Sequence, residues 1–158
     1  MQIVITAEII GSGRITDWDV ALYVASGVHV KEFPALVPNN RQFAVAFIFE
    51  TVWDAGEFCR FSKTLLRSGA RAFGFAGVMC NAAEDIVDEN RIDIEVDEGG
   101  ISIPTLTFRS ESLEESLQTL LGVYISNCEG AAVAPALIVF HVGTRDSFAS
   151  LLNQLNMI

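Results

Sequence analysis

Three short runs of apolar residues that do not alternate with polar ones stand out along the chain, at residues 43–49, 72–76 and 136–140. Such runs are typical of interior strands in a parallel sheet, which is covered on both faces. Residues 1–10 and 105–108 are predicted to form further strands. Helical patterns separate these runs, so the order strand, helix, strand recurs. That order predicts an open, mainly parallel, Rossmann-like α/β sheet.

Four segments combine helical spacing of apolar residues with end signals. Capping residues followed later by glycine predict helices over residues 16–27, 51–69 and 112–130, and a leucine-rich stripe predicts another over residues 148–155. Each helix can cover one face of the sheet. The pattern therefore predicts a single three-layer α/β domain over residues 1–158.

The acidic residues are concentrated in one segment. Residues 84–98 hold eight of the twenty Asp and Glu residues against one basic residue, Arg91, which gives them a formal charge of −7 out of −10 for the chain. Within this segment, residues 92–97 alternate between aliphatic and acidic side chains, which is the period of a strand. Gly99 and Gly100 permit a turn after it. We therefore expect an acidic edge strand or hairpin, whose charges would also discourage edge-to-edge aggregation.

Composition limits the class of protein. No apolar run reaches the roughly 18 residues of a membrane-spanning helix, and the start of the chain lacks the features of a signal peptide. Three widely spaced cysteines are typical of free thiols. We therefore expect a cytoplasmic protein that contacts no membrane. The high apolar content, with a mean hydropathy of +0.39, leaves a homodimer possible.

The charge balance also bears on the partner. A pI near 4.5 and only ten Lys and Arg residues, without a basic cluster, disfavour nucleic-acid binding. A concentrated acidic segment favours a basic protein partner.

Candidate chemistry is sought where the strands end, because open α/β sheets place their sites outside the carboxyl ends of the strands. Glu50, Cys80, Arg109 and His141 follow or end predicted strands, and Asp146 comes shortly afterwards. A Cys80 thiolate, assisted by His141 and oriented by Glu50 or Asp146, would form a nucleophilic site. Acidic surroundings oppose thiolate formation, and the alternative is a buried cysteine and a hydrogen-bonded histidine.

Metal and cofactor motifs are weak. Mixed metal ligands are conceivable, but their spacing matches no metal motif. The set comprises Cys80, Glu84, Asp85, Asp88 and His141. The segment GSGRIT at residues 11–16 lacks the third glycine of a dinucleotide fingerprint and the lysine of a P-loop. We predict no resident metal or cofactor.

Two short motifs carry a resemblance. The segment CNAAEDIVDEN places Asp85 and Asp88 after Cys80 in a C-x4-D-x2-D arrangement, and ALIVFHVG places His141 at the end of a late strand. In these motifs, residues 43–143 resemble an uncharacterised family of small bacterial α/β domains. The resemblance implies the fold and a focal point at these four residues, and it implies no activity.

These features favour a non-catalytic bacterial binding protein that occludes a basic partner with its acidic surface, as an immunity protein or antitoxin does when it blocks a toxin. The predicted contact residues are Glu84, Asp85, Asp88, Glu89, Asp93, Glu95 and Asp97. One alternative is a small hydrolase or transferase that uses Cys80 and His141. Another is a structural subunit of a homo-oligomer whose acidic patch only keeps it in solution.

Overall fold

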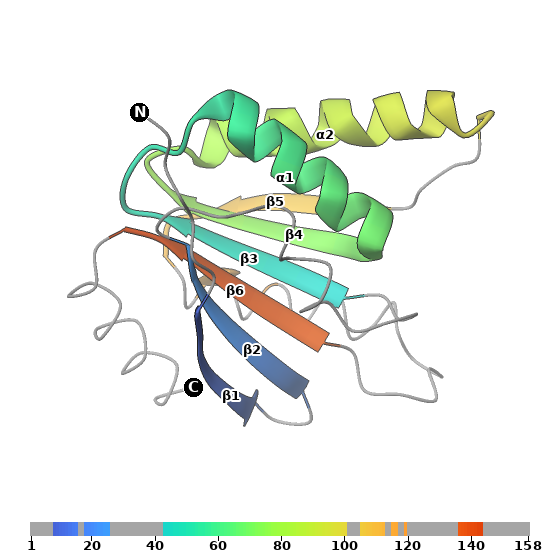
Figure 1. Cartoon of the computed structure of the whole chain (residues 1–158). Helices are drawn as coiled ribbons and strands as arrows, with labels where there is room; N and C mark the ends of the chain where they lie inside the picture. Colours follow the sequence, from blue (N-terminus) through green and yellow to red (C-terminus); the bar gives the residue numbers. More distant parts are fainter. Residues whose placement is uncertain are drawn as a thin grey trace.

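The computed structural model describes residues 8–15, 18–25, 43–100, 105–112, 115–116, 119 and 136–143. In this part of the chain a twisted sheet carries two helices, α1 and α2, on one of its faces (Figure 1). The strands are β1 (Glu8–Ile15), β2 (Trp18–Ala25), β3 (Phe43–Phe49), β4 (Ala70–Gly77), β5 (Leu106–Ser110) and β6 (Ala136–Val142).

The six strands lie in the order β1-β2-β6-β3-β4-β5. Only β1 and β2 pair antiparallel, and the other four neighbouring pairs are parallel. The three apolar runs form β3, β4 and β6 at the centre, and the described residues of β3 are almost all buried. The prediction of an open, mainly parallel α/β sheet is therefore confirmed.

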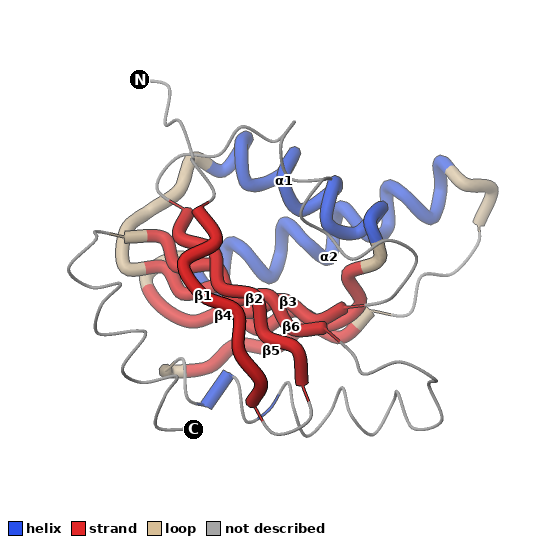
Figure 2. Tube along the Cα trace, turned by 60° about the horizontal axis from the view of Figure 1, so that its bottom comes forward, coloured by secondary structure: helices blue, strands red, loops and turns tan. Residues whose placement is uncertain are grey.

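Helix α1 (Ala55–Ser68) lies within the helix predicted over residues 51–69, but its N-cap is Asp54 and not Thr51. The carboxylate of Asp54 accepts a hydrogen bond of 3.0 Å from the backbone N–H of Glu57, which satisfies one of the free donors of the first turn. Gly69 ends the helix in the left-handed conformation, with φ of 114°. Helix α2 (Cys80–Asp97) lies beside α1 on the same face (Figure 2).

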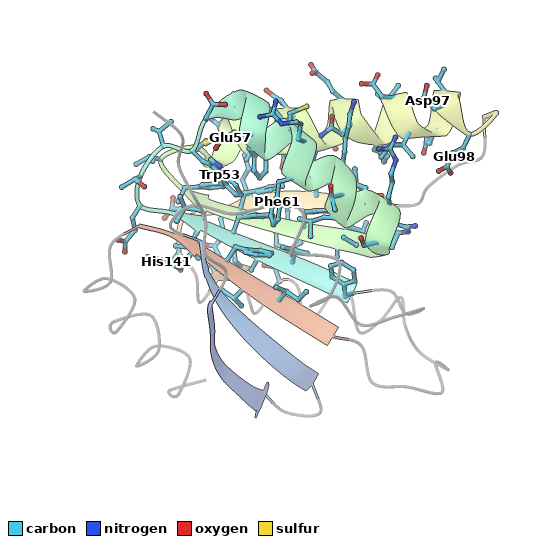
Figure 3. The ribbon with its side chains drawn as sticks, viewed as in Figure 1. Trp53, Glu57, Phe61, Asp97, Glu98 and His141 are labelled. Atoms are coloured by element: carbon cyan, nitrogen blue, oxygen red, sulfur yellow. The ribbon has the colours of Figure 1, made fainter. Side chains whose placement is uncertain are left out.

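Aromatic side chains fill the space between the helices and the sheet (Figure 3). The ring of Phe47 on β3 stacks on Phe140 of β6 at 5.1 Å between centroids, and it meets the edge of Phe58 on α1 at 5.2 Å. Phe61 meets Phe140 edge to face, also at 5.1 Å. Such pairs contribute about 0.5–1.5 kcal/mol each beyond the area they bury. They join α1 to the two central strands.

The predicted helix over residues 16–27 is wrong, because residues 18–25 form strand β2. This strand pairs antiparallel with β1 and parallel with β6. The segment contains Val20, Tyr23 and Val24, residue types that favour strands, and the ladder bonds to two neighbours outweigh a local capping signal. Of the strand predicted over residues 1–10, residues 8–10 lie in β1, which continues to Ile15, and residues 1–7 are outside the described part.

The predicted acidic edge strand or hairpin is also wrong, because residues 92–97 belong to α2. Val87 and Ile94 are buried seven residues apart, whereas Ile92 and Val96 are exposed. The six-residue alternation was thus a coincidence within a longer helical period that begins at Cys80. Extending an existing helix gains one hydrogen bond for each residue that is fixed, which favours the helix over a new strand. The edge strands are β1 and β5.

The predicted third layer would come from residues 112–130 and 148–155, which lie mostly outside the described residues. Within the first of these segments, residues 115, 116 and 119 are helical and Ser116 is buried. The hydroxyl of Ser112 accepts a hydrogen bond of 3.2 Å from the backbone N–H of Glu115, as a helix N-cap does.

Candidate functional site

The carboxyl ends of the central strands bring Glu50 and His141 together. Nε2 of His141 on β6 lies 3.3 Å from Oε1 of Glu50, which directly follows β3. The histidine side chain is fully buried, and the glutamate side chain is 44% exposed. The chain leaves β3 towards β4 and β5, whereas β6 lies on the other side of β3. The pair therefore flanks the point where the strand order reverses, which is the usual ligand crevice of such sheets.

Gly143 allows this pair to form. A Cβ atom on Gly143 would lie 2.8 Å from Cε1 of His141 and 2.9 Å from Oε2 of Glu50, closer than a side chain can approach. Backbone bonds hold the same corner, since the N–H groups of Glu50 and Thr51 both donate to the carbonyl of Val142, at 2.9 and 3.2 Å.

Cys80 lies at the same edge of the sheet but outside this pair. It begins α2 directly after β4, and its thiol contacts Oδ1 of its neighbour Asn81 at 3.7 Å. Strand β3 separates β4 from β6, so two strand spacings, roughly 10 Å, lie between their axes. A nucleophile and its base need about 3 Å. The predicted convergence at one edge is found, but in the described residues Cys80 makes no hydrogen bond with His141. Asp146 lies outside the described residues.

Helix α2 carries the seven predicted contact residues, and three of them are partly buried and paired with other side chains of the chain. Arg109 on β5 pairs with Glu84, with 3.5 Å between Nε and Oε1, and the hydroxyl of Thr107 donates to Asp88 at 3.2 Å. Glu95 pairs with Arg91 on its own helix at 3.2 Å. Glu84 and Asp88 thus attach α2 to the edge strand.

The other four contact residues are Asp85, Glu89, Asp93 and Asp97, all of which are exposed. We call them the acidic face. They recur every four residues, so they form one stripe along α2. Asp93 lies 3.8 Å from the Lys63 ammonium of α1. In Figure 3, Asp97 and the following Glu98 lie at the end of α2 that is far from His141. The C-terminal end of the acidic face therefore lies away from Glu50 and His141.

Ile92 and Val96 are residues that the sequence pattern placed wrongly. They are 51% and 71% exposed on the outside of α2, although the alternation assigned them to the apolar face of an edge strand. The helical spacing of Ala83, Val87 and Ile94, all buried, is the signal that would have shown them to point outwards.

A buried polar cluster fixes the rotation of α2 against α1. Nδ2 of Asn90 donates to Oγ of Ser62 at 2.7 Å and to the carbonyl of Cys59 at 2.9 Å, and its Oδ1 accepts from the Cys59 thiol at 3.3 Å. Every polar atom of the Asn90 side chain thus has a partner. Such a satisfied network specifies one arrangement of the two helices, and so determines which residues of α2 face outwards.

The described residues form no metal cluster: nowhere among them do three or more His, Cys, Asp or Glu side chains lie close enough together to hold an ion. In the same part of the chain, no helix is both long and apolar enough to cross a membrane.

Comparisons of the chain with protein-family models, curated proteins and solved structures found no match. The resemblance to an uncharacterised bacterial family therefore stays a prediction.

Proposed function

We propose that this chain is a non-catalytic, cytoplasmic bacterial protein that binds and occludes a basic protein partner, as an immunity protein or antitoxin does for its toxin. The observation that carries the proposal is the acidic face of α2, a row of exposed carboxylates on an outer helix. Occlusion requires no catalytic group on the blocking protein, and charge complementarity speeds the encounter.

The acidic face weakens the helix that carries it. Like charges four residues apart destabilise a helix by about 0.2–0.5 kcal/mol for each pair. Asp97 and Glu98 also stand at the C-terminal end of α2, where the helix dipole is negative and no basic residue is present in the last turn. A basic partner would relieve both repulsions, so part of its binding energy would come from strain that the free protein carries.

Charge on α1 directs such a partner to α2. Arg60 and Arg67 are exposed on α1, and Lys63 lies towards Asp93. A basic protein is therefore repelled by the outer side of α1 and attracted by α2. Opposite potentials on neighbouring helices favour one docking position over others.

The alternative function is a small hydrolase or transferase that depends on Cys80. The observation in its favour is that Cys80, Glu50 and His141 share the carboxyl edge of the sheet. It would require His141 to leave its buried contact with Glu50 and approach the thiol, so the present geometry supports binding better. A third possibility is that the chain is a structural subunit of a homo-oligomer. The carboxylates of α2 would then only keep the protein in solution.

Co-expression tests the proposal. The probe is the protein encoded beside this chain in its genome, which we expect to carry a basic domain, produced in a bacterial host with and without the chain. We expect growth arrest by that protein alone and rescue by the chain. The variant E89Q/D97N should rescue less well than E111Q/E115Q, which removes two exposed carboxylates elsewhere. A neighbouring protein that is not basic, or equal rescue by the two variants, would overturn the proposal.

A further inference from the structure

The outer side of α2 is not purely acidic. Ile92 and Val96 stand four residues apart, hence on one side of the helix, and each exposes more than half of its side chain. We call these two residues the apolar ridge. On a helix surface, the residues adjacent to Ile92 include Asp88, Glu89 and Glu95, which are all acidic.

We infer that the partner docks through a basic amphipathic helix, which lies along α2 with apolar side chains on the apolar ridge and Lys or Arg side chains against the surrounding carboxylates. This inference rests on the proposed function and specifies the chemistry of the partner. On α2, aliphatic side chains are surrounded by negative charges. The complementary surface is a helix whose apolar stripe is flanked by positive charges.

A helix fits this surface better than an added strand or a disordered basic tail. The backbone groups of α2 are bonded within the helix, apart from those at its ends, so they offer no ladder to an extended peptide. A disordered basic tail would satisfy the carboxylates but leave Ile92 and Val96 in water. Residues 85–98 span roughly 20 Å, enough for about 14 residues of a paired helix.

The surface is held in a fixed orientation before the partner arrives. The Asn90 cluster sets the rotation of α2, and the contact of Arg109 with Glu84 fixes its side towards β5. Little conformational entropy is therefore lost in α2 on docking, which favours affinity.

Peptide titration tests the inference. The probes are two 18-residue peptides of leucine, alanine and lysine with the same composition, one with its apolar residues in a helical stripe and one shuffled. We expect the chain to bind the striped peptide at least tenfold more tightly. The variant I92T/V96T should lose about tenfold in affinity for the striped peptide, through loss of apolar contact, and should bind the shuffled one as before.

A matched control is available on the chain itself. Val52 and Val78 are 70% and 66% exposed, similar to Val96, but lie after β3 and β4 and not on α2. The variant V52T/V78T should bind both peptides like the unmodified chain. Denaturation curves for every variant show whether the fold is retained.

The outcomes separate the two proposals. If I92T/V96T binds the striped peptide as tightly as the unmodified chain does, helix docking is overturned, and weaker binding by E89Q/D97N would still support the proposed function. If E89Q/D97N binds both peptides no more weakly than E111Q/E115Q, the proposed function itself fails. Self-association of the unmodified chain in sedimentation equilibrium, abolished by I92T/V96T, would assign the apolar ridge to a second copy and overturn the inference.

Discussion

Asn90 of α2 donates a 2.7 Å hydrogen bond to the hydroxyl of Ser62 on α1, and both side chains are buried. This bond belongs to the buried polar cluster between the two helices, and it sets the face that α2 turns outwards. We expect Asn90→Ala to lower the free energy of unfolding by about 1–3 kcal/mol, because Ser62 and Cys59 then lose buried partners. Urea denaturation measures the change. Asp85→Asn on the exposed side should shift it by less than about 0.5 kcal/mol.

Alanine substitutions at Gly77 and Gly99 distinguish the cost of crowding by a Cβ atom from the cost of backbone strain. Both have positive φ, at 98° and 79°. A Cβ on Gly77 would lie 2.0 Å from the carbonyl oxygen of Phe49, whereas a Cβ on Gly99 would meet nothing within 4 Å. Gly99→Ala should cost about 1 kcal/mol, and Gly77→Ala should cost more than about 4 kcal/mol or prevent folding. Equal thermal stabilities would show that the corner after β4 is looser than described.

Gly143 should be coupled to Glu50. We expect Gly143→Ala to destabilise the protein, because its Cβ would approach Glu50 and His141 too closely. In a Glu50→Gly background, which removes Oε2 and Cβ of Glu50, at 2.9 and 3.1 Å from the added Cβ, the same substitution should cost at least about 0.5 kcal/mol less. A double-mutant cycle by chemical denaturation measures this coupling. Additive effects would mean that the crowding is relieved by movement of the backbone.

The acidic face should lower the stability of the free protein. Asp97→Asn removes a negative charge at the negative end of the dipole of α2. We expect the free energy of unfolding to rise by about 0.3–1 kcal/mol at low salt, and the gain should shrink as salt screens the charge. Glu111→Gln, away from α2, serves as the control. If Asp97→Asn lowered stability, the carboxylate would have a stabilising contact and the electrostatic argument for a partner would be lost.

The central sheet could be predicted from the sequence because its signals are long and consistent. The buried run at residues 43–49 lacks alternation, and the helix predicted over residues 51–69 contains α1 and ends at the observed C-cap, Gly69. Predictions that depended on short sequence patterns were wrong. The alternation over residues 92–97 covers fewer than two helical turns, and only the longer spacing from Ala83 to Ile94 shows the helix.

Only the position of the candidate site at the sheet edge could be predicted from the sequence, and the contacts within it could not. Strand direction alone places Glu50, Cys80 and His141 at one edge. The pairing within that edge depends on strand order, since β6 adjoins β3 and not β4, and non-local strand order is not encoded in any local pattern. The buried Asn90 likewise fixes the rotation of α2 about its axis. This rotation turns Glu84 and Asp88 towards β5 and leaves Asp85 facing outwards.

The most direct test of the central claim is the association rate of the chain with the protein encoded beside it, which we expect to be basic, measured by stopped flow at increasing salt. We expect the rate to fall steeply with salt, because the Debye length is only about 8 Å at physiological ionic strength. At low salt, E89Q/D97N should associate several-fold more slowly than E111Q/E115Q and show a weaker salt dependence. Equal rates for these two variants, with the same dependence on salt, would contradict docking through the acidic face of α2.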